Sequence, residues 1–189
     1  MTYKTFSFPQ FPDYTVFVGY YTDITPETLK VVKNELVSGN QTYNYCFVNT
    51  AHLISVDQLY CSLHRSIQNH VFGRMKAKTL NTEILYNLSP TNNINEALKR
   101  FGVDESRSDI IVIKVAQNSE DDLLSCNAGI EELLSGKSTT ELEDSVLVNR
   151  VDLKKFLKLF KIQQSNEDLQ KAQLHYTSEA VAASLLRGC

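Results

Sequence analysis

The eight residues Asp109–Ala116, with the sequence DIIVIKVA, constrain the fold of this chain more than any other segment. Nearly all of these side chains are apolar and most are β-branched, a composition typical of a strand that is buried on both faces. Such a strand needs neighbouring strands and a cover of helices. A chain of 189 residues is long enough for one well-buried core and short for two. We therefore expect one domain over residues 1–189.

Further segments alternate between strand and helix patterns along the chain. Strands are predicted where β-branched and aromatic residues cluster, at residues 15–20, 43–48 and 83–88. Helices are predicted where apolar residues recur every three or four positions, at residues 26–37, 56–72, 94–101, 120–135, 150–161 and 167–186. This order predicts an α/β (α+β) fold with helices flanking a central sheet of about four strands. The pattern leaves open whether that sheet is mostly antiparallel or mixed.

Capping residues indicate where several of these helices begin and end. Serine, threonine and asparagine side chains accept hydrogen bonds from first-turn backbone N–H groups, and glycine readily ends a helix. These preferences predict helix starts after Thr25, Ser55 and Asn93, and helix ends at Gly73 and Gly102.

The composition argues against several classes of protein. The first ten residues lack the apolar region of a signal peptide, and the apolar runs are far shorter than the ~18–20 residues of a membrane span. We expect an intracellular chain with no membrane segment. The four cysteines are 15, 65 and 63 residues apart, and the seven glycines all stand alone. These spacings predict reduced thiols, no metal, no phosphate-binding loop and no cofactor.

One pair of side chains could support catalysis. Cys61 and His64 lie one helical turn apart, which could place a thiol beside an imidazole. A cysteine on the apolar side of an amphipathic helix is more often a small hydrophobic side chain. We therefore predict that the chain is not an enzyme, with a thiol-dependent enzyme using Cys61 and His64 as the alternative.

The net charge of −3 conceals two segments of opposite sign. Residues 58–82 contain four lysines and arginines and no acid, whereas residues 104–144 contain eleven acids and three bases. Arg74, Lys76 and Lys78 alternate after a predicted helix end, so in an extended segment they would project to one side about 6–7 Å apart. This spacing roughly matches successive phosphates of a single nucleic-acid strand. The alternative is a solvated charged face without a ligand.

The C-terminal residues 180–186, AVAASLL, are small and apolar to a degree unusual for a solvated helix end. They either pack on the core of the chain or form a face for a partner protein. One helix can do both.

Three runs of sequence carry a family resemblance: RMKAKTLNTE at residues 74–83, NLSPTNNI at residues 87–94 and EALKRFGV at residues 96–103. Together they resemble the kinase-binding regulatory subunits of the KEOPS/EKC complex, the PRPK-binding protein family. The FPQFP at residues 8–12 and the LRG at residues 186–188 are similar to those of fungal members.

The resemblance implies a non-catalytic protein of the nucleus and cytoplasm. It implies direct binding and stimulation of the small KEOPS protein kinase, and indirect contact with the other KEOPS subunits. It also implies recruitment of tRNA through its 3′ CCA end for threonylcarbamoyladenosine modification at position 37, with a link to telomere maintenance. A pure scaffold without RNA contact is an alternative.

Carried over by position, the polar motif of the family falls on Arg74, Lys76, Lys78, Asn81 and Glu83, which the resemblance implies as contacts of the RNA end. The family often has arginine where Lys78 stands. Lysine keeps the charge but lacks the planar bidentate group, so a phosphate contact survives the change.

For the kinase, we expect contacts from the C-terminal helix. The chief candidates are Val181, Leu185 and Leu186, with Arg187 at the end of the helix.

Overall fold

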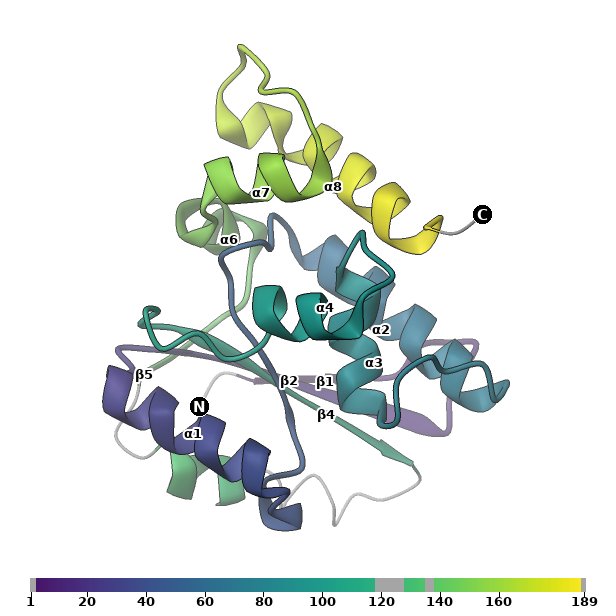
Figure 1. The fold of residues 1–189 in the computed structure, drawn as a ribbon, viewed down its shortest axis with the longest axis vertical. Coiled ribbons are helices and arrows are strands. Elements are labelled where there is room, and N and C mark those ends of the chain that lie inside the picture. The colour runs from purple at the N-terminus through teal and green to yellow at the C-terminus, as the bar shows by residue number, and fades with distance from the viewer. Residues whose placement is uncertain (1–2, 118–127, 135–137, 188–189) are drawn as a thin grey trace. The chain divides into compact units, whose positions relative to one another are not determined.

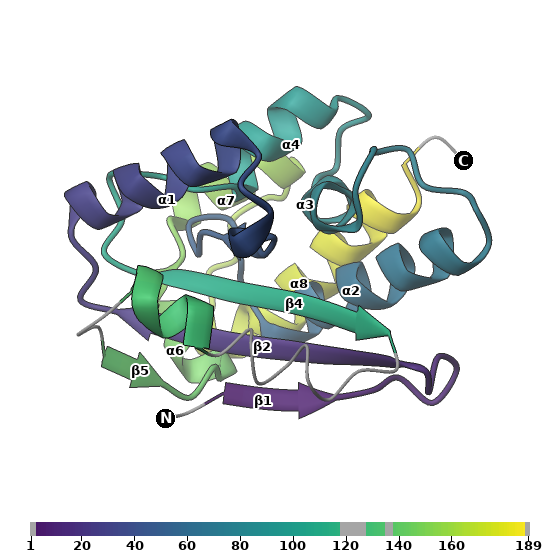
Figure 2. The same ribbon diagram turned by 90° about the horizontal axis from the view of Figure 1, so that it is seen from below.

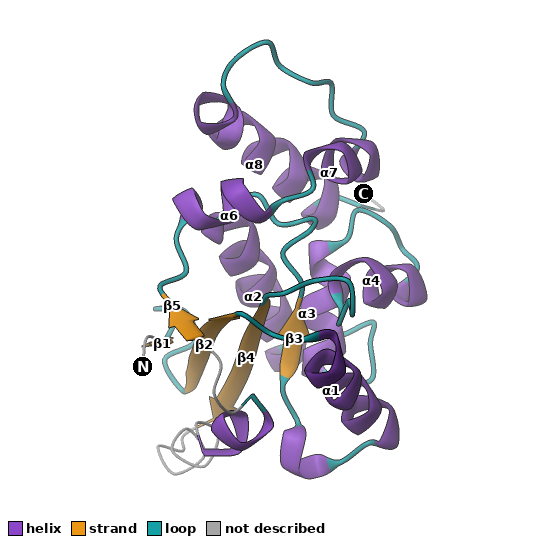
Figure 3. Ribbon diagram, turned by 90° about the vertical axis from the view of Figure 1, so that its left-hand side faces the viewer, coloured by secondary structure: helices purple, strands orange, loops and turns teal. Residues whose placement is uncertain are grey.

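The computed structural model describes residues 3–117, 128–134 and 138–187, and the chain divides into two compact units. The first unit combines Met1–Asn49 with Val103–Glu141, and the second combines Thr50–Gly102 with Leu142–Cys189. Figure 3 shows that the described strands belong to the first unit, while the second unit is helical. Each unit is therefore assembled from two stretches that are distant in the sequence.

The first unit is built on an antiparallel sheet (Figures 1 and 2), with strands β1 (Tyr3–Phe6), β2 (Tyr14–Thr22), β3 (Cys46–Val48), β4 (Ile110–Gln117) and β5 (Ser138–Thr140). The strand order is β1-β2-β4-β3, and β5 pairs with the end of β2 that β1 leaves free. β4 lies between β2 and β3, and residues 110–113 are buried. The prediction of a central strand in this segment is confirmed.

Helix α1 (Pro26–Ser38) contributes to the core of the first unit. Its buried residues Leu29 and Val32 belong to the same cluster as Phe17, Phe47 and Val112 of the strands. The apolar positions that recur along this helix therefore face the sheet, as an amphipathic pattern requires.

The second unit contains helices α2 (Val56–Val71), α3 (Leu80–Leu88), α4 (Ile94–Phe101), α6 (Asp144–Arg150), α7 (Leu153–Phe160) and α8 (Leu169–Leu185). α8 contacts α2, α3, α6 and α7. The core of the second unit contains three aromatic pairs. Their ring centroids lie 6.5 Å apart for Phe101 and Phe160, 4.8 Å for Phe156 and Phe160, and 6.3 Å for Phe156 and Tyr176. The C-terminal helix is thus part of the folded unit and not an appendage.

The α+β class and a mostly antiparallel sheet are confirmed, and within the first unit α1 packs on that sheet. A single domain over residues 1–189 stays a prediction. The helix starts are also confirmed, since the side chains of Thr25, Ser55 and Asn93 accept hydrogen bonds from Thr28, Gln58 and Glu96 backbone N–H groups, respectively. No helix in the described ranges combines the length and apolar character that a bilayer crossing needs.

The predicted strand at residues 83–88 is wrong, because these residues lie in α3. Thr79 caps this helix by accepting a hydrogen bond from the Thr82 backbone N–H at 3.2 Å. All six residues from Glu83 to Leu88 are buried, so the helix lacks the polar face that would have revealed its period. A run of six residues without an exposed polar face is too short for its pattern to distinguish a helix from a strand.

Other boundaries differ from the predictions. The strand expected at residues 43–48 is confined to β3, because residues 41–43 form a 3-10 turn. The helix expected at residues 150–161 is α7, which begins three residues later with Asp152 as its cap, and the preceding α6 was not predicted. Within the helix expected at residues 120–135, residues 128–133 are helical, and residues 120–127 and 135 lie outside the described part of the chain. Strands β1 and β5 were not predicted.

Candidate functional site

The basic segment after α2 begins at a well-defined helix end. Gly73 adopts φ +63°, in the left-handed region. Its backbone N–H donates to the carbonyl of His70 at 3.2 Å, and the Arg74 N–H donates to the carbonyl of Asn69 at 2.7 Å. These two bonds form a Schellman motif, which glycine favours because it has no Cβ. The predicted end of the helix at Gly73 is confirmed, and it sets the direction of the following loop.

The loop of residues 74–79 is held in its middle by Glu83. This carboxylate is fully buried. Its Oε2 accepts hydrogen bonds from the backbone N–H groups of Lys76 at 2.9 Å and Ala77 at 2.8 Å. The loop therefore bends at residues 76–79 and is not the extended segment expected from the alternating cations.

The cations of this loop lie at the surface. Arg74, Lys76 and Lys78 are exposed, and Asn81 is half-buried. Within the part of the chain that the structure describes, neither lysine forms an ion pair. The guanidinium carbon of Arg74 lies 5.7 Å from the ring centre of Phe72, whose side chain is 58% exposed. A phenylalanine is usually expected in the core, but the ring of Phe72 is exposed and is therefore open to stacking.

Glu83 differs from the rest of the implied RNA-contacting set. Because its side chain has no exposed surface and both oxygens accept hydrogen bonds, it cannot contact a macromolecule in this conformation. The structure assigns it a place beneath the loop instead.

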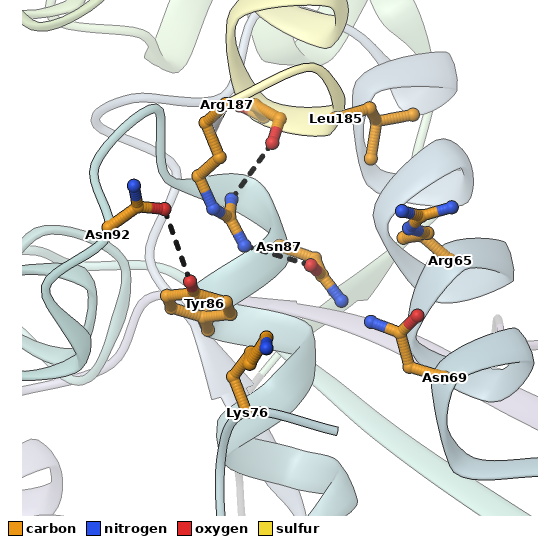
Figure 4. A pocket seen from close by; sticks show the side chains of 9 residues that line it. Arg65, Asn69, Lys76, Tyr86, Asn87, Asn92, Leu185 and Arg187 are labelled. Atoms are coloured by element: carbon orange, nitrogen blue, oxygen red, sulfur yellow. Dashed lines mark hydrogen bonds between the residues drawn. The ribbon is translucent and has the colours of Figure 1, made fainter. Parts of the chain in front are cut away.

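A pocket of about 360 Å³ opens beside this loop in the second unit (Figure 4). In Figure 4, Lys76 lies across the pocket from Arg187, and Arg65 and Asn69 reach it from α2. None of its lining residues is acidic; they are Arg65, Asn69, Lys76, Tyr86, Asn87, Asn92, Ser184, Leu185 and Arg187. A concave site lined by cations and amides concentrates positive potential, so it suits an anionic ligand with polar edges.

Arg187 joins the end of α8 to α3. Its guanidinium carbon lies 3.8 Å from the ring centre of Tyr86, the closest cation–ring approach among the described residues. It donates hydrogen bonds to the side-chain oxygen of Asn87 at 3.0 Å, to the carbonyl of Ser184 at 3.0 Å and to the carbonyl of Ser89. These contacts within the chain use three of the five N–H donors of the guanidinium.

The two faces of α8 have different environments. Ala172, Tyr176, Ala180 and Ser184 are buried within the second unit. Val181 and Leu185 are half-buried and line a narrow crevice that also contains Cys61. Leu186 is 63% exposed and Leu174 is 75% exposed. Since positions 174, 181 and 185 lie on one side of a helix, α8 presents an apolar strip that begins in the solvent and ends in the crevice.

The pair considered for thiol chemistry has unfavourable electrostatics for that role. Burial raises the pKa of the Cys61 thiol, and the nearby Asp57 carboxylate raises it further. A reactive cysteine needs the opposite shift, because the thiolate is the nucleophile. In the described ranges, no group of three or more potential metal ligands is present.

Several residues of the site were not identified from the sequence. Arg65 lies in the basic segment but was not assigned a role, and Tyr86 was placed in a strand. Leu174 could have been found, because it precedes Val181 by seven positions, the spacing of two helical turns. Asn69 and Asn92 carry no such signal, since only packing brings them to one pocket.

Comparison with known proteins identifies the family. The model of the family described as kinase binding protein CGI-121 matches residues 21–185. The chain belongs to this family. It is 43% identical to the EKC/KEOPS complex subunit CGI121 of Debaryomyces hansenii, and 33% identical to that of Candida albicans, over the full length of both proteins in each case. It is 29% identical to the subunit of Yarrowia lipolytica over 96% of this chain and 98% of that protein.

Proposed function

We propose that the chain is a non-catalytic subunit of the KEOPS/EKC complex that binds and stimulates the small KEOPS kinase and recruits tRNA through its 3′ CCA end. The tRNA would then receive threonylcarbamoyladenosine at position 37 through the chemistry of another subunit. A link to telomere maintenance and a location in the nucleus and cytoplasm belong to the same proposal. The names of the full-length fungal relatives support the complex.

The observation that carries the RNA role is the exposed cationic loop beside an acid-free pocket of about 360 Å³. Lys76 belongs to both, so a strand whose phosphates contact the loop is led to the pocket. Phe72, exposed beside Arg74, offers a ring for base stacking.

The RNA role is tested by replacing Lys76 and Lys78 with alanine. The variant should bind a tRNA transcript ending in CCA more weakly. The negative slope of log K against log salt should become shallower by about 0.7 per lost phosphate contact. The matched control replaces Lys154 and Lys158, two exposed lysines of α7, so that the net charge changes equally. An unchanged slope in the loop variant, or an equal change in the control, would contradict the RNA role of the loop. The alternative of a scaffold without RNA contact would then be favoured.

The kinase role is tested on the exposed residues of α8. Leu186→Glu and Leu174→Glu should each weaken binding of the kinase subunit about tenfold or more without unfolding the chain, because neither side chain is in the core. The matched control is Val37→Glu on α1, where an equally apolar side chain is 83% exposed.

A double replacement of Val181 and Leu185 by glutamate should abolish kinase binding. Because both side chains are half-buried, circular dichroism must show that this variant remains folded. Full kinase binding by the folded double variant and by Leu186→Glu would remove α8 from the proposal.

A further inference from the structure

The buried carboxylate of Glu83 is saturated with hydrogen-bond donors. Besides the two backbone N–H groups of the loop, which bond to Oε2, its Oε1 accepts from the side-chain amides of Asn69 at 2.8 Å and Asn87 at 3.4 Å. A buried carboxylate is costly unless such partners surround it. The chain thus keeps a fully hydrogen-bonded carboxyl group in its interior, against the backbone of the cationic loop.

We propose that Glu83 is a positioning residue for RNA binding, which acts through the backbone of Lys76 and Ala77 to fix the directions of the loop cations. The inference rests on the proposed RNA role of the loop.

Hydrogen bonds link Glu83, which lies on α3, to α2 and to Arg187 at the end of α8. Asn87 on α3 donates to the hydroxyl of Ser66 on α2 at 2.9 Å and accepts from Arg187. The backbone carbonyl of Asn69 on α2 accepts from the N–H of Arg74 at the start of the loop. These hydrogen bonds hold the carboxylate in one position. The carboxylate in turn holds the backbone of Lys76 and Ala77, which bond to it.

Loss of the carboxylate would affect the loop more than the helices. The N–H groups of Lys76 and Ala77 would lose their acceptor, and Ala77 is buried, so water could reach its N–H only if the loop opened. An open loop keeps all its cations but presents them in many directions. Binding then has to order the loop, which lowers RNA affinity without reducing the number of charges.

Glu83→Gln tests the inference, because it keeps the shape and replaces one acceptor oxygen by an NH2 group. The NH2 group of the glutamine must face either the two backbone N–H groups or the side-chain amides of Asn69 and Asn87. In both cases it meets a donor where the carboxylate oxygen was an acceptor. Affinity for a tRNA transcript ending in CCA should fall about fivefold or more at fixed salt, with the salt slope unchanged and kinase binding within twofold of the original. Hydrogen exchange of the Lys76 and Ala77 amides should accelerate.

The double variant Glu83→Gln with Asn69→Asp provides the rescue. The new carboxylate can accept from the glutamine NH2, while the glutamine oxygen accepts from the loop backbone. Slow exchange at both loop amides should return toward the original values, and exchange is the readout because Asn69 itself lines the pocket. A role confined to general stability would not be rescued in this selective way.

The outcomes separate the inference from the function on which it rests. Unchanged RNA affinity in folded Glu83→Gln, despite faster loop exchange, would overturn the positioning role alone. Failure of the unaltered chain to bind the transcript would overturn the RNA proposal itself. If Glu83→Gln does not fold, Asn69→Ala, which removes one side-chain donor to the carboxylate, must show faster loop exchange and a larger loss of affinity than Asn92→Ala, which changes a residue of the same pocket that accepts from Tyr86; equal losses in the two variants would refute the inference.

Discussion

Replacing Arg187 with methionine should loosen the end of α8 by a measurable amount. The change keeps most of the apolar stem and removes three donated hydrogen bonds and the cation over Tyr86. A hydrogen bond from a charged group contributes about 1.5–3 kcal/mol, and a cation–ring contact about 0.5–2 kcal/mol. Because the Arg187 side chain is half-buried and solvent screens part of each contribution, we expect the free energy of unfolding to fall by about 2–3 kcal/mol.

A double-mutant cycle isolates the contact with the ring. Arg187→Met, Tyr86→Leu and the double variant are unfolded in urea and followed by circular dichroism. The coupling free energy should be about 1 kcal/mol. Tyr86→Phe is the matched control, since it keeps the ring and removes only the hydroxyl that donates to Asn92 at 3.4 Å. With phenylalanine at position 86, the coupling to Arg187 should persist.

A coupling below about 0.3 kcal/mol, with all variants folded, would refute this reasoning, because additivity at that level is what independent sites show. The guanidinium would then contribute only through its hydrogen bonds. The same variants report on function, since a frayed end of α8 should also weaken kinase binding by Leu186.

Three further predictions concern single residues. Gly73→Ala should lower the free energy of unfolding by about 1 kcal/mol through backbone strain alone, because an added Cβ meets nothing within 4 Å at φ +63°; Gly73→Asn, which tolerates this conformation, should lose less in the same urea titration. Cys61 should react with iodoacetamide at pH 7.5 more slowly than free cysteine, because burial raises the pKa of its thiol; a faster reaction would restore the thiol-enzyme alternative. Burial lowers the pKa of His52, whose Nε2 has no hydrogen-bond partner among the described residues. The unfolded chain therefore binds the proton more readily, and the free energy of unfolding should fall as the pH drops from 7.5 to 5. His52→Asn should flatten that dependence, and an identical slope in this variant would contradict the assignment.

The sequence predicted those elements whose local signals agree with their packing. β4 is apolar over residues 110–113 because these lie buried in the middle of the sheet, and α1, α2 and α4 have capping residues before an amphipathic pattern. α3 was misassigned because burial on all sides removes the polar face from its pattern. The exposed edge strand β1 was missed because it buries too little to show an apolar face.

For the candidate site, the motif of residues 74–83 indicated the cations but not their arrangement. An alternating series of charges predicts an extended strand, whereas the bent loop depends on a carboxylate that accepts from the backbone between those charges. The chemical type of Glu83 was visible in the sequence. Its burial was not, because burial depends on the helices around it.

The sequence by itself determined the family, the antiparallel sheet's central strand and the basic character of residues 74–78, since each is encoded in contiguous residues. Only the tertiary structure decided that Glu83 lies inside, and that Arg187 reaches Asn87, a hundred residues earlier in the chain, to complete one wall of the pocket. The physical reason is that hydrogen bonds and cation–ring contacts act over a few ångströms. Which groups come that close is set by helix packing and not by spacing along the chain.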